Sequence, residues 1–531
     1  MLSKLTLLAL AVGGPLASPL QNSAPQVTIA NGTVLGGVKG NVEFYKGIPF
    51  AEPPVGDLRF KHPRPFNSDF GTLEATEKAP ICMQAGAEGA SEDCLTLQVL
   101  RPVDTPASSK LPVAVFIHGG AFSGGGAEDG NDMTPIVEKS IEMDAPVIIV
   151  SIQYRLGAFG FLAGKELAAE GNTNLGLRDQ RLAMQWVQDN IAAFGGDPEK
   201  VVIWGFSAGA MSVFDHSIIN GGNADGLFRG MITSSGSVLS SESVTSSKAQ
   251  EVYDIVASRA GCAGAESLEC LRALSAEDLL EASSSLNLEF RWLGGNPPYI
   301  PRPDTSDSFM PLAGDAALAD GKYAKVPMLT GNSEDEGTLF ALTQINVTNA
   351  AILEDYLATY YPGNEEYTRD LVSLYPDDLG ISGSPYRTGL SNNVFGQYKR
   401  LASILGDITF IFQRRFHLEK ISSEVPTWSY LSSSLHGVPI VGSMHGGDAM
   451  QTLSGSTSSP AVTQGRWIVS FINELDPNAL GVSAPLIELP RYTTSDLQQV
   501  QINAPGNNLI KDDYRSEQYE YWRDNVSKFR L

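Results

Sequence analysis

Short apolar runs alternate with amphipathic segments along much of the chain. The runs end in glycine or polar turns and cover residues 112–120, 145–152, 201–207, 230–237 and 325–333. Their hydrophobicity is continuous, which predicts strands covered on both faces. Between them, segment 175–194 has helical spacing, with Leu182, Trp186 and Ile191 near one face. This alternation predicts an α/β fold, in which helices flank both faces of a mainly parallel sheet.

The run 201–207 leads into GFSAG at 205–209. A β-branched run, a glycine-flanked serine and a small-residue helix start are typical of the strand, turn and helix that expose a nucleophile. Gly205 and Gly209 leave room where side chains would collide. The pentapeptide alone is weak, and a turn serine without chemistry is the alternative. The flanking elements and the glycine loop in PVAVFIHGGAF favour Ser207 as the nucleophile.

A catalytic serine requires a base, and the chain has six histidines: His62, His118, His216, His417, His436 and His445. In folds of this kind the order is serine, acid, histidine, which removes the first two. His216 lies on the presumed helix leaving Ser207, and His417 lies in RRFHLEK, which has the pattern of a charged helix face. His445 follows an apolar run directly and is favoured over His436, which precedes that run.

The acid must orient the imidazole and stabilise its positive form, so it is expected on a loop after a late strand. The segment KVPMLTGNSEDEG offers Glu334, Asp335 and Glu336. Spacing does not choose among these three carboxylates.

The N-terminal segment predicts an exported protein, and the absence of linkers from the rest of the sequence predicts one large domain. Residues 1–17 contain a lysine, a short apolar stretch and small residues near Ala17, the pattern of a signal peptide. Residues 18–531 show no linker or repeat that separates folding units, and no stretch approaches eighteen consecutive apolar residues. We expect a helical insertion at about 245–300. Sequons at Asn31, Asn346 and Asn525 are candidate glycosylation sites.

The four cysteines form two local pairs, which in an exported protein indicate disulfides. The simplest pairing joins Cys82 to Cys94 and Cys262 to Cys270, and two other pairings remain open. Neither pair has the spacing of a metal knuckle and no HExxH occurs, so no metal site is expected.

The formal net charge of −23 arises from 37 basic and 60 acidic side chains. This charge argues against nucleic acid and anionic membrane surfaces as partners and favours neutral substrates. An alternative is that acidity only keeps the protein soluble.

Several long motifs resemble the type-B carboxylesterase and lipase family, particularly secreted fungal lipases and sterol esterases. They include YKGIPFAEPPVGDLRF, EDCLTLQVLRP, YRLGAFGFL, FGGDPEKVVIWGFSAG, GNSEDEGTLF and GSMHGGD. The resemblance runs from about residue 27 to the C-terminus. It implies an α/β-hydrolase fold, with Ser207 as nucleophile, Glu336 as acid and His445 as base. It also implies the disulfide pairing given above.

By the same resemblance, the backbone N–H groups of Gly120, Ala121 and Ala208 form the oxyanion hole. Ala121 replaces the glycine that most members carry, but a backbone donor survives an added methyl group. The alternative is a glycine-rich turn that only lets the chain bend. The following GGGAEDG lacks the GK[ST] ending of a phosphate loop.

Two further departures affect function. Most relatives have glutamate before the serine, where this chain has Phe206, and phenylalanine cannot supply negative charge to the base. We therefore expect Phe206→Glu to change the pH dependence of turnover. The disulfide loop 82–94, which carries a long amphipathic lid in the related lipases, has Met83 as its one bulky apolar side chain. This predicts a short lid, an open site and little rise in activity when substrate passes its solubility limit.

The predicted chemistry is two-step acyl transfer without a cofactor, acting on neutral esters such as acylglycerols, sterol esters and simple esters, also at a lipid–water interface. One rival is a narrow carboxylesterase of small soluble esters. A non-catalytic, cholinesterase-like binding protein is another, although such proteins typically lack the serine. Peptidase activity is less favoured. The oligomeric state is not predicted.

Overall fold

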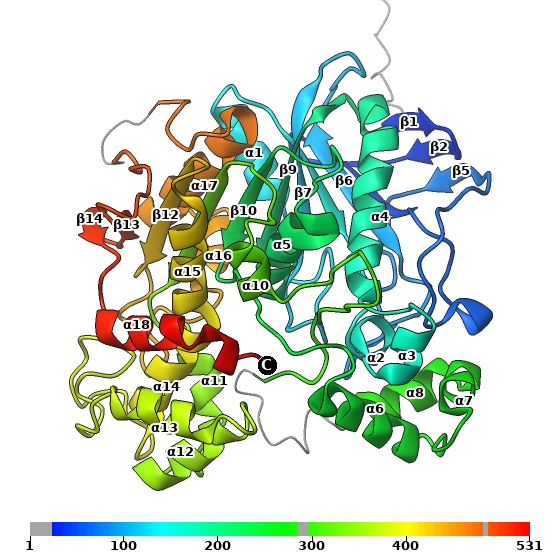
Figure 1. The fold of residues 1–531 in the computed structure, drawn as a ribbon. Coiled ribbons are helices and arrows are strands. Elements are labelled where there is room, and N and C mark those ends of the chain that lie inside the picture. Colours follow the sequence, from blue (N-terminus) through cyan, green and yellow to red (C-terminus); the bar gives the residue numbers. More distant parts are fainter. Residues whose placement is uncertain (1–23, 285–295, 482–486) are drawn as a thin grey trace, which may run out of the picture.

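A large twisted sheet crosses the computed structural model, which describes residues 24–284, 296–481 and 487–531 (Figure 1). Its eleven strands run, from one edge to the other, β14 (Asn508–Lys511), β13 (Gln498–Ile502), β12 (Thr427–Ser432), β11 (Met328–Ser333), β10 (Gly230–Ser234), β9 (Gly196–Phe206), β7 (Leu111–Ile117), β8 (Ile148–Ile152), β6 (Thr96–Pro102), β4 (Val42–Pro49) and β3 (Gly37–Lys39). Neighbours from β13 to β8 are parallel, and the pairs outside this central part are antiparallel.

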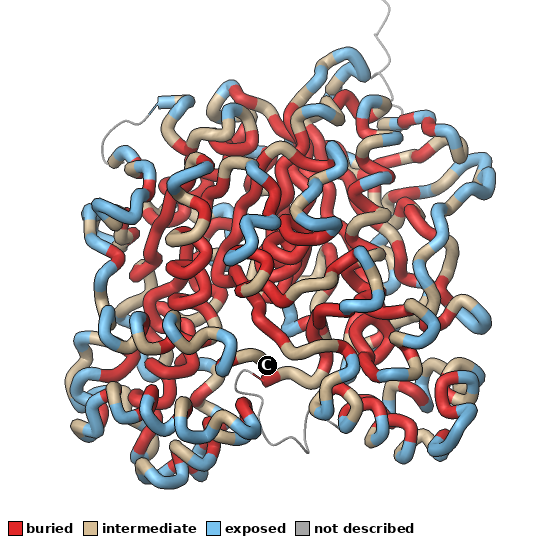
Figure 2. Tube along the Cα trace, in the orientation of Figure 1, coloured by how far each residue is buried: buried red, intermediate tan, exposed pale blue. Residues whose placement is uncertain are grey.

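The sheet buries side chains on both faces, as the continuous hydrophobicity predicts. In β7, Val113, Val115 and Ile117 join one core with α4 (Leu175–Asn190) and α5 (Ala208–Ile218). The alternate residues Ala114 and Phe116 join a second core with α1 (Thr134–Glu142) and α17 (Ser459–Glu474). Figure 2 shows buried positions concentrated in this layered centre. The predicted mainly parallel sheet with helices on both faces is therefore confirmed.

The boundaries of the elements differ from the sequence pattern in detail. The five apolar runs correspond to β7, β8, β9, β10 and β11, but β7 and β10 end before the glycines that close their runs. Strand β9 begins at Gly196, earlier than predicted. The predicted helix 175–194 is α4 up to Asn190, and a 3-10 turn, Ile191–Phe194, completes it.

Two groups of helices lie at one end of the sheet (Figure 1). One contains α6 (Ser247–Arg259), α7 (Ser267–Ala273) and α8 (Ala276–Ser284), within the region 245–300 that we expected to be helical. The other contains α11 (Thr338–Leu342), α12 (Ala350–Ala358), α13 (Glu365–Ser373) and α14 (Tyr398–Gly406). Part of the predicted insertion, 285–295, and the predicted signal peptide, 1–17, lie outside the described residues.

The remaining elements complete the layers. A separate small sheet contains β1 (Gln26–Ile29), β2 (Gly32–Leu35) and β5 (Gly71–Glu74). The other helices are α2 (Gly157–Phe161), α3 (Lys165–Ala169), α10 (Gly314–Ala319), α15 (Phe412–Ile421), α16 (Gly447–Leu453) and α18 (Ser516–Asp524). Within the described part of the chain, no helix combines the length and apolar character needed to cross a bilayer.

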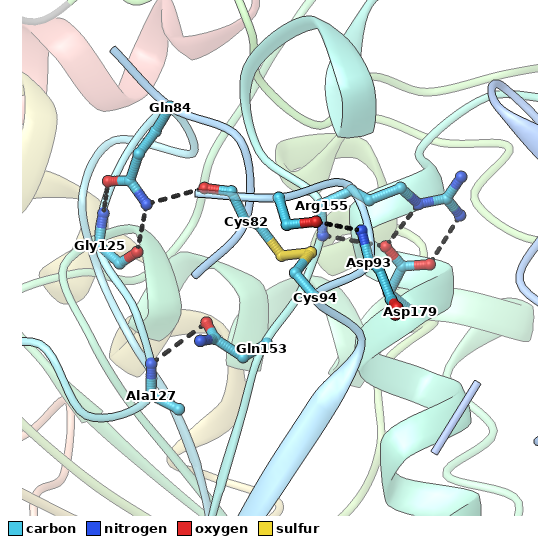
Figure 3. The surroundings of a disulfide bond; sticks show 10 residues. Cys82, Gln84, Asp93, Cys94, Gly125, Ala127, Gln153, Arg155 and Asp179 are labelled. Carbon is cyan, nitrogen blue, oxygen red and sulfur yellow. Dashed lines mark hydrogen bonds and ion pairs between the residues drawn. A yellow bond between two sulfur atoms is a disulfide. The ribbon is translucent and has the colours of Figure 1, made fainter. Parts of the chain in front are cut away.

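The structure pairs the cysteines as the sequence predicts, Cys82 with Cys94 and Cys262 with Cys270. The loop closed by Cys82 and Cys94 folds back on the protein. Its one bulky apolar side chain, Met83, is buried. Figure 3 shows this disulfide beside the glycine-rich segment that contains Gly125.

Candidate active site

Ser207 stands on a sharp turn between β9 and α5. Its backbone has φ 55° and ψ −124°, a conformation that side chains rarely adopt and that marks a functional constraint. The flanking glycines make the turn sterically accessible. A Cβ atom at Gly205 would lie 2.1 Å from Gly209 O, and one at Gly209 would lie 2.0 Å from Ile117 O. At positions 205 and 209 this turn therefore accommodates glycine, because any side chain would collide with main-chain atoms.

His445 and Glu336 converge on this serine from later parts of the chain. Nε2 of His445 lies 2.8 Å from Oγ of Ser207, and Nδ1 lies 2.6 Å from Oε2 of Glu336. The side chain of Glu336 is fully buried and that of His445 is 10 % exposed. A hydroxyl, an imidazole and a carboxylate thus form one hydrogen-bonded line, with distances suited to proton transfer.

Buried polar groups hold Glu336 in place. Its Oε1 accepts hydrogen bonds from Asn332 Nδ2 at 3.1 Å and from the N–H of Ser333 at 2.8 Å. Asn332 Oδ1 in turn accepts from Nε of Arg414 at 2.7 Å. Arg414 donates to both carboxylate oxygens of Asp512 at 2.8 Å. Burial by itself would raise the pKa of Asp512, but the neighbouring arginines outweigh it and hold that pKa below its usual range.

The other acidic candidates face away from the base. Glu334 forms an ion pair with Arg387. Asp335 accepts from Ser384 Oγ and from the backbone N–H of Tyr386 and Ser443. Burial, together with Glu334, raises the pKa of Asp335.

The alternative base, His436, lies with these two carboxylates, and their ligand atoms fall within 4.8 Å of one another. The carboxylate oxygens of this group already accept from protein donors, so their bonding requires no metal ion. The structure brings His445 to Ser207 and leaves His436 with the two unused acids.

His216 and His417 are buried in the core, and the environment of His417 differs from that predicted by the sequence. His216 is buried on α5 against Oε1 of Gln180 at 2.9 Å. His417 was expected on a charged helix face, but α15 is buried there and Nδ1 of His417 lies 3.0 Å from Ser237 Oγ. Burial lowers the pKa of His417 to about 3. Two arginines of that helix, Arg414 and Arg415, form buried ion pairs with Asp512, a partner that the local sequence does not reveal.

Two residues with candidate backbone donors, Ala121 and Ala208, line the same cavity as Ser207. Ala208 begins α5, so its N–H is one of the helix's first, unpaired donors. The carbonyl of Gly119 lies 2.8 Å from Nδ1 of His118, and the carbonyl of Gly120 accepts from the N–H groups of Ser123 and Gly124. Because a trans peptide directs its C=O and N–H oppositely, these bonds turn the N–H groups of Gly120 and Ala121 the other way. Burial lowers the pKa of His118 to about 4.

Three phenylalanine rings enclose the imidazole of His445. The ring centroids of Phe206, Phe340 and Phe410 lie 5.2, 5.2 and 4.5 Å from that of the imidazole. Aromatic faces within about 6 Å attract a cation. The Phe206 ring supplies no negative charge, but it stands where an aromatic ring can stabilise an imidazolium.

A largely apolar cavity of about 360 Å³ opens beside Ser207 and the backbone donors. Its apolar walls include Met211, Leu239, Ile300, Phe340, Phe410 and Leu531. Thr409 and Phe410 reach it from a π-helical turn, Asp407–Ile411, that interrupts the continuous helix formed by α14 and α15. Such single turns often occur at functional sites. Sequence reasoning missed these lining residues, since they come from distant segments and carry no motif.

One buried carboxyl group lies just beyond His445. Asp448 accepts a hydrogen bond from the Tyr430 hydroxyl at 2.9 Å and from the N–H of Ala449 at 2.8 Å. Burial, with the nearby Glu336, raises the pKa of Asp448 to about 6. The charge on this group therefore changes close to neutrality.

The three candidate glycosylation sites differ in accessibility. Asn346 is exposed. Nδ2 of Asn31 donates to the carbonyls of Phe66 and Ser68, and Nδ2 of Asn525 donates to that of Tyr521. Asn346 is the one whose amide has no competing bond that the structure records among its described residues.

The sequence and the fold of this chain are similar to those of known lipases and esterases. The sequence profile described as "Carboxylesterase family" matches residues 23–522. The chain is 43% identical to "Secreted lipase 1" of Botryotinia fuckeliana, covering 96% of this chain and 94% of the relative. It is 40% identical to "Secreted triacylglycerol lipase LIP1" of Gibberella zeae, with 96% and 92% covered. Among solved structures, Aspergillus niger EstA superposes with a TM-score of 0.83 at 26% identity, covering 96% of this chain and 100% of that one. The chain belongs to the carboxylesterase family.

Proposed function

We propose that Ser207, His445 and Glu336 are the catalytic triad of this carboxylic ester hydrolase. The observation that carries the proposal is the hydrogen-bonded line of the three side chains at the wall of an apolar cavity. His445 takes the proton of Ser207 as the hydroxyl attacks the ester carbonyl, and Glu336 stabilises the imidazolium that forms. The N–H groups of Gly120, Ala121 and Ala208 donate to the oxyanion.

Collapse of the tetrahedral intermediate releases the alcohol, which receives the proton from His445, and leaves an acyl group on Ser207. Water then attacks the acyl-enzyme with His445 again as the base. The triad and the backbone donors carry out both steps, so the proposal needs no cofactor.

The substrates that fit are neutral esters with an apolar acyl or alcohol part. The cavity of about 360 Å³ and its apolar walls support this range, and the net charge of −23 disfavours anionic substrates and surfaces. The names of the relatives extend the proposal to acylglycerols at a lipid–water interface. They also support export of this chain, together with its two disulfides. In an exported protein, the exposed sequon at Asn346 is a candidate glycosylation site.

The decisive experiment compares the wild type with Ser207→Ala on p-nitrophenyl esters of increasing acyl length, on triacylglycerols and on sterol esters. We expect Ser207→Ala to lose at least about 10³-fold in kcat. Retention of ester hydrolysis by Ser207→Ala would reject the nucleophile. A steep loss of activity beyond short acyl chains would instead favour the narrow carboxylesterase.

A further inference from the structure

The loop closed by Cys82 and Cys94 reaches the segment that carries the proposed oxyanion donors. Nε2 of Gln84 donates to the carbonyl of Gly125 at 2.8 Å, and the N–H of Gly125 donates to Oε1 of Gln84 at 2.8 Å. Nε2 also lies 3.1 Å from the carbonyl of Cys82, beside the disulfide. Figure 3 shows these bonds, which join the disulfide loop to the backbone of Gly125. Gln84 thus holds both peptide groups that flank Gly125, and a paired donor and acceptor fix this residue better than one bond can.

Close backbone packing connects Gly125 to the nucleophile. A Cβ atom at Gly125 would lie 2.5 Å from Gly119 O, and one at Gly119 would lie 2.8 Å from Cβ of Ser207. Gly120 closes the turn between them, because its carbonyl accepts from the N–H groups of Ser123 and Gly124. A shift of the Gly125 peptide would therefore move the peptides of Gly120 and Ala121.

We propose that Gln84 is a positioning residue that holds the oxyanion loop in its productive orientation through Gly125. The short disulfide loop then acts as a brace for the catalytic backbone. Gln84 is also one of the residues that line the cavity. This inference rests on the proposed function, since it assigns a purpose to the same backbone donors.

Gln84→Met tests the bond without emptying the space. Methionine keeps the length and volume of the side chain but neither donates to nor accepts from Gly125. We expect kcat on p-nitrophenyl butyrate to fall about tenfold while KM stays within about twofold, because the loss affects a group that binds the transition state. The inhibition constant of a trifluoromethyl ketone, whose adduct with Ser207 carries an oxyanion, should rise by a similar factor.

Two controls separate positioning from general stability. Gln188→Met removes a similar side-chain bond, from Nε2 to the carbonyl of Leu227, away from the site, and should leave both constants unchanged. Active-site titration corrects every value for the folded fraction. A lower kcat with an unchanged inhibition constant would overturn the positioning role, as would a kcat equal to that of the wild type.

A double-mutant cycle tests the brace itself. Replacing Cys82 and Cys94 by serine should lower kcat in the wild type but add little in Gln84→Met, because both changes release the same peptide. Full additivity would overturn the brace. Failure of the proposed function has a different signature: Ser207→Ala and the wild type would then hydrolyse the ester equally.

Discussion

The two sides of the active site are built by different means. On the Ser207 side, backbone contacts hold the geometry. The glycines at 205 and 209 touch neighbouring main-chain atoms, and the donors are peptide N–H groups. Their spacing follows from a short motif, because residues that are close in sequence lie close in the turn.

On the His445 side, side chains far apart in sequence hold the geometry. Asn332 donates a hydrogen bond to Glu336 and accepts one from Arg414. Arg414 in turn forms an ion pair with Asp512, which lies 98 residues later in the chain. Three phenyl rings from separate segments pack around the imidazole. The turn that carries Ser207 is therefore encoded locally, whereas the position of His445 relies on long-range packing and burial.

The largest effect should come from removing the charge next to the base. In Glu336→Gln we expect kcat to fall about 10³- to 10⁴-fold, because an amide neither stabilises the imidazolium nor enforces the required tautomer. Steady-state hydrolysis of p-nitrophenyl butyrate measures it. Glu334→Gln, two residues away and paired with Arg387, is the matched control and should stay within about twofold. Equal losses in the two variants would remove Glu336 from the triad.

Arg414→Met should break the remote support of the base. It leaves the fully buried Asp512 partly uncompensated, and losing one partner of a buried ion pair typically costs about 3–5 kcal/mol in the free energy of unfolding. Urea denaturation provides the measurement. Arg523→Met, which removes partly exposed ion pairs with Asp524 and Glu419, should cost less than about 1 kcal/mol. If the denaturation midpoint of Arg414→Met equals that of the wild type, the buried pair of Arg414 and Asp512 does not stabilise the His445 side of the site.

Phe206→Glu changes a residue that precedes Ser207 in sequence and whose ring packs against the imidazole of His445. A carboxylate beside the imidazole favours its protonated form, and the base must be neutral to accept the serine proton. We expect the acid limb of the kcat/KM profile to move to higher pH by up to about one unit. Phe206→Leu, which removes the ring without adding charge, should not move the limb upward. Profiles for Phe206→Glu and the wild type that coincide would eliminate this role for position 206.

The smallest effect should follow from Ala121→Gly, on the Ser207 side of the site. Ala121 has φ 52°, a strained value for a residue with a Cβ atom. Glycine removes this strain but gains freedom in the unfolded chain, so the two contributions of about 1 kcal/mol largely cancel. We expect kcat and the denaturation midpoint to change little, since the donor is the N–H group. A tenfold loss of kcat would show that the methyl group itself matters.

The layered fold and the sharp turn at Ser207 could be predicted because their signals are local. Continuous apolar runs mark strands such as β7 and β10, whose two faces are both buried. The turn at Ser207 depends on glycines two residues away on each side. Hydrophobic periodicity and short motifs express these features within a few residues, where the chain's own geometry limits the alternatives.

Only the tertiary structure decided what surrounds the base. The neighbourhood of His417 looked like an exposed charged helix, yet Arg414 and Arg415 on that helix are buried against Asp512. Glu334, Asp335 and Glu336 are equivalent by spacing, and their roles separate only because one side chain points to His445. Burial and ion pairing depend on partners brought together by folding, and the distance along the chain carries no record of them.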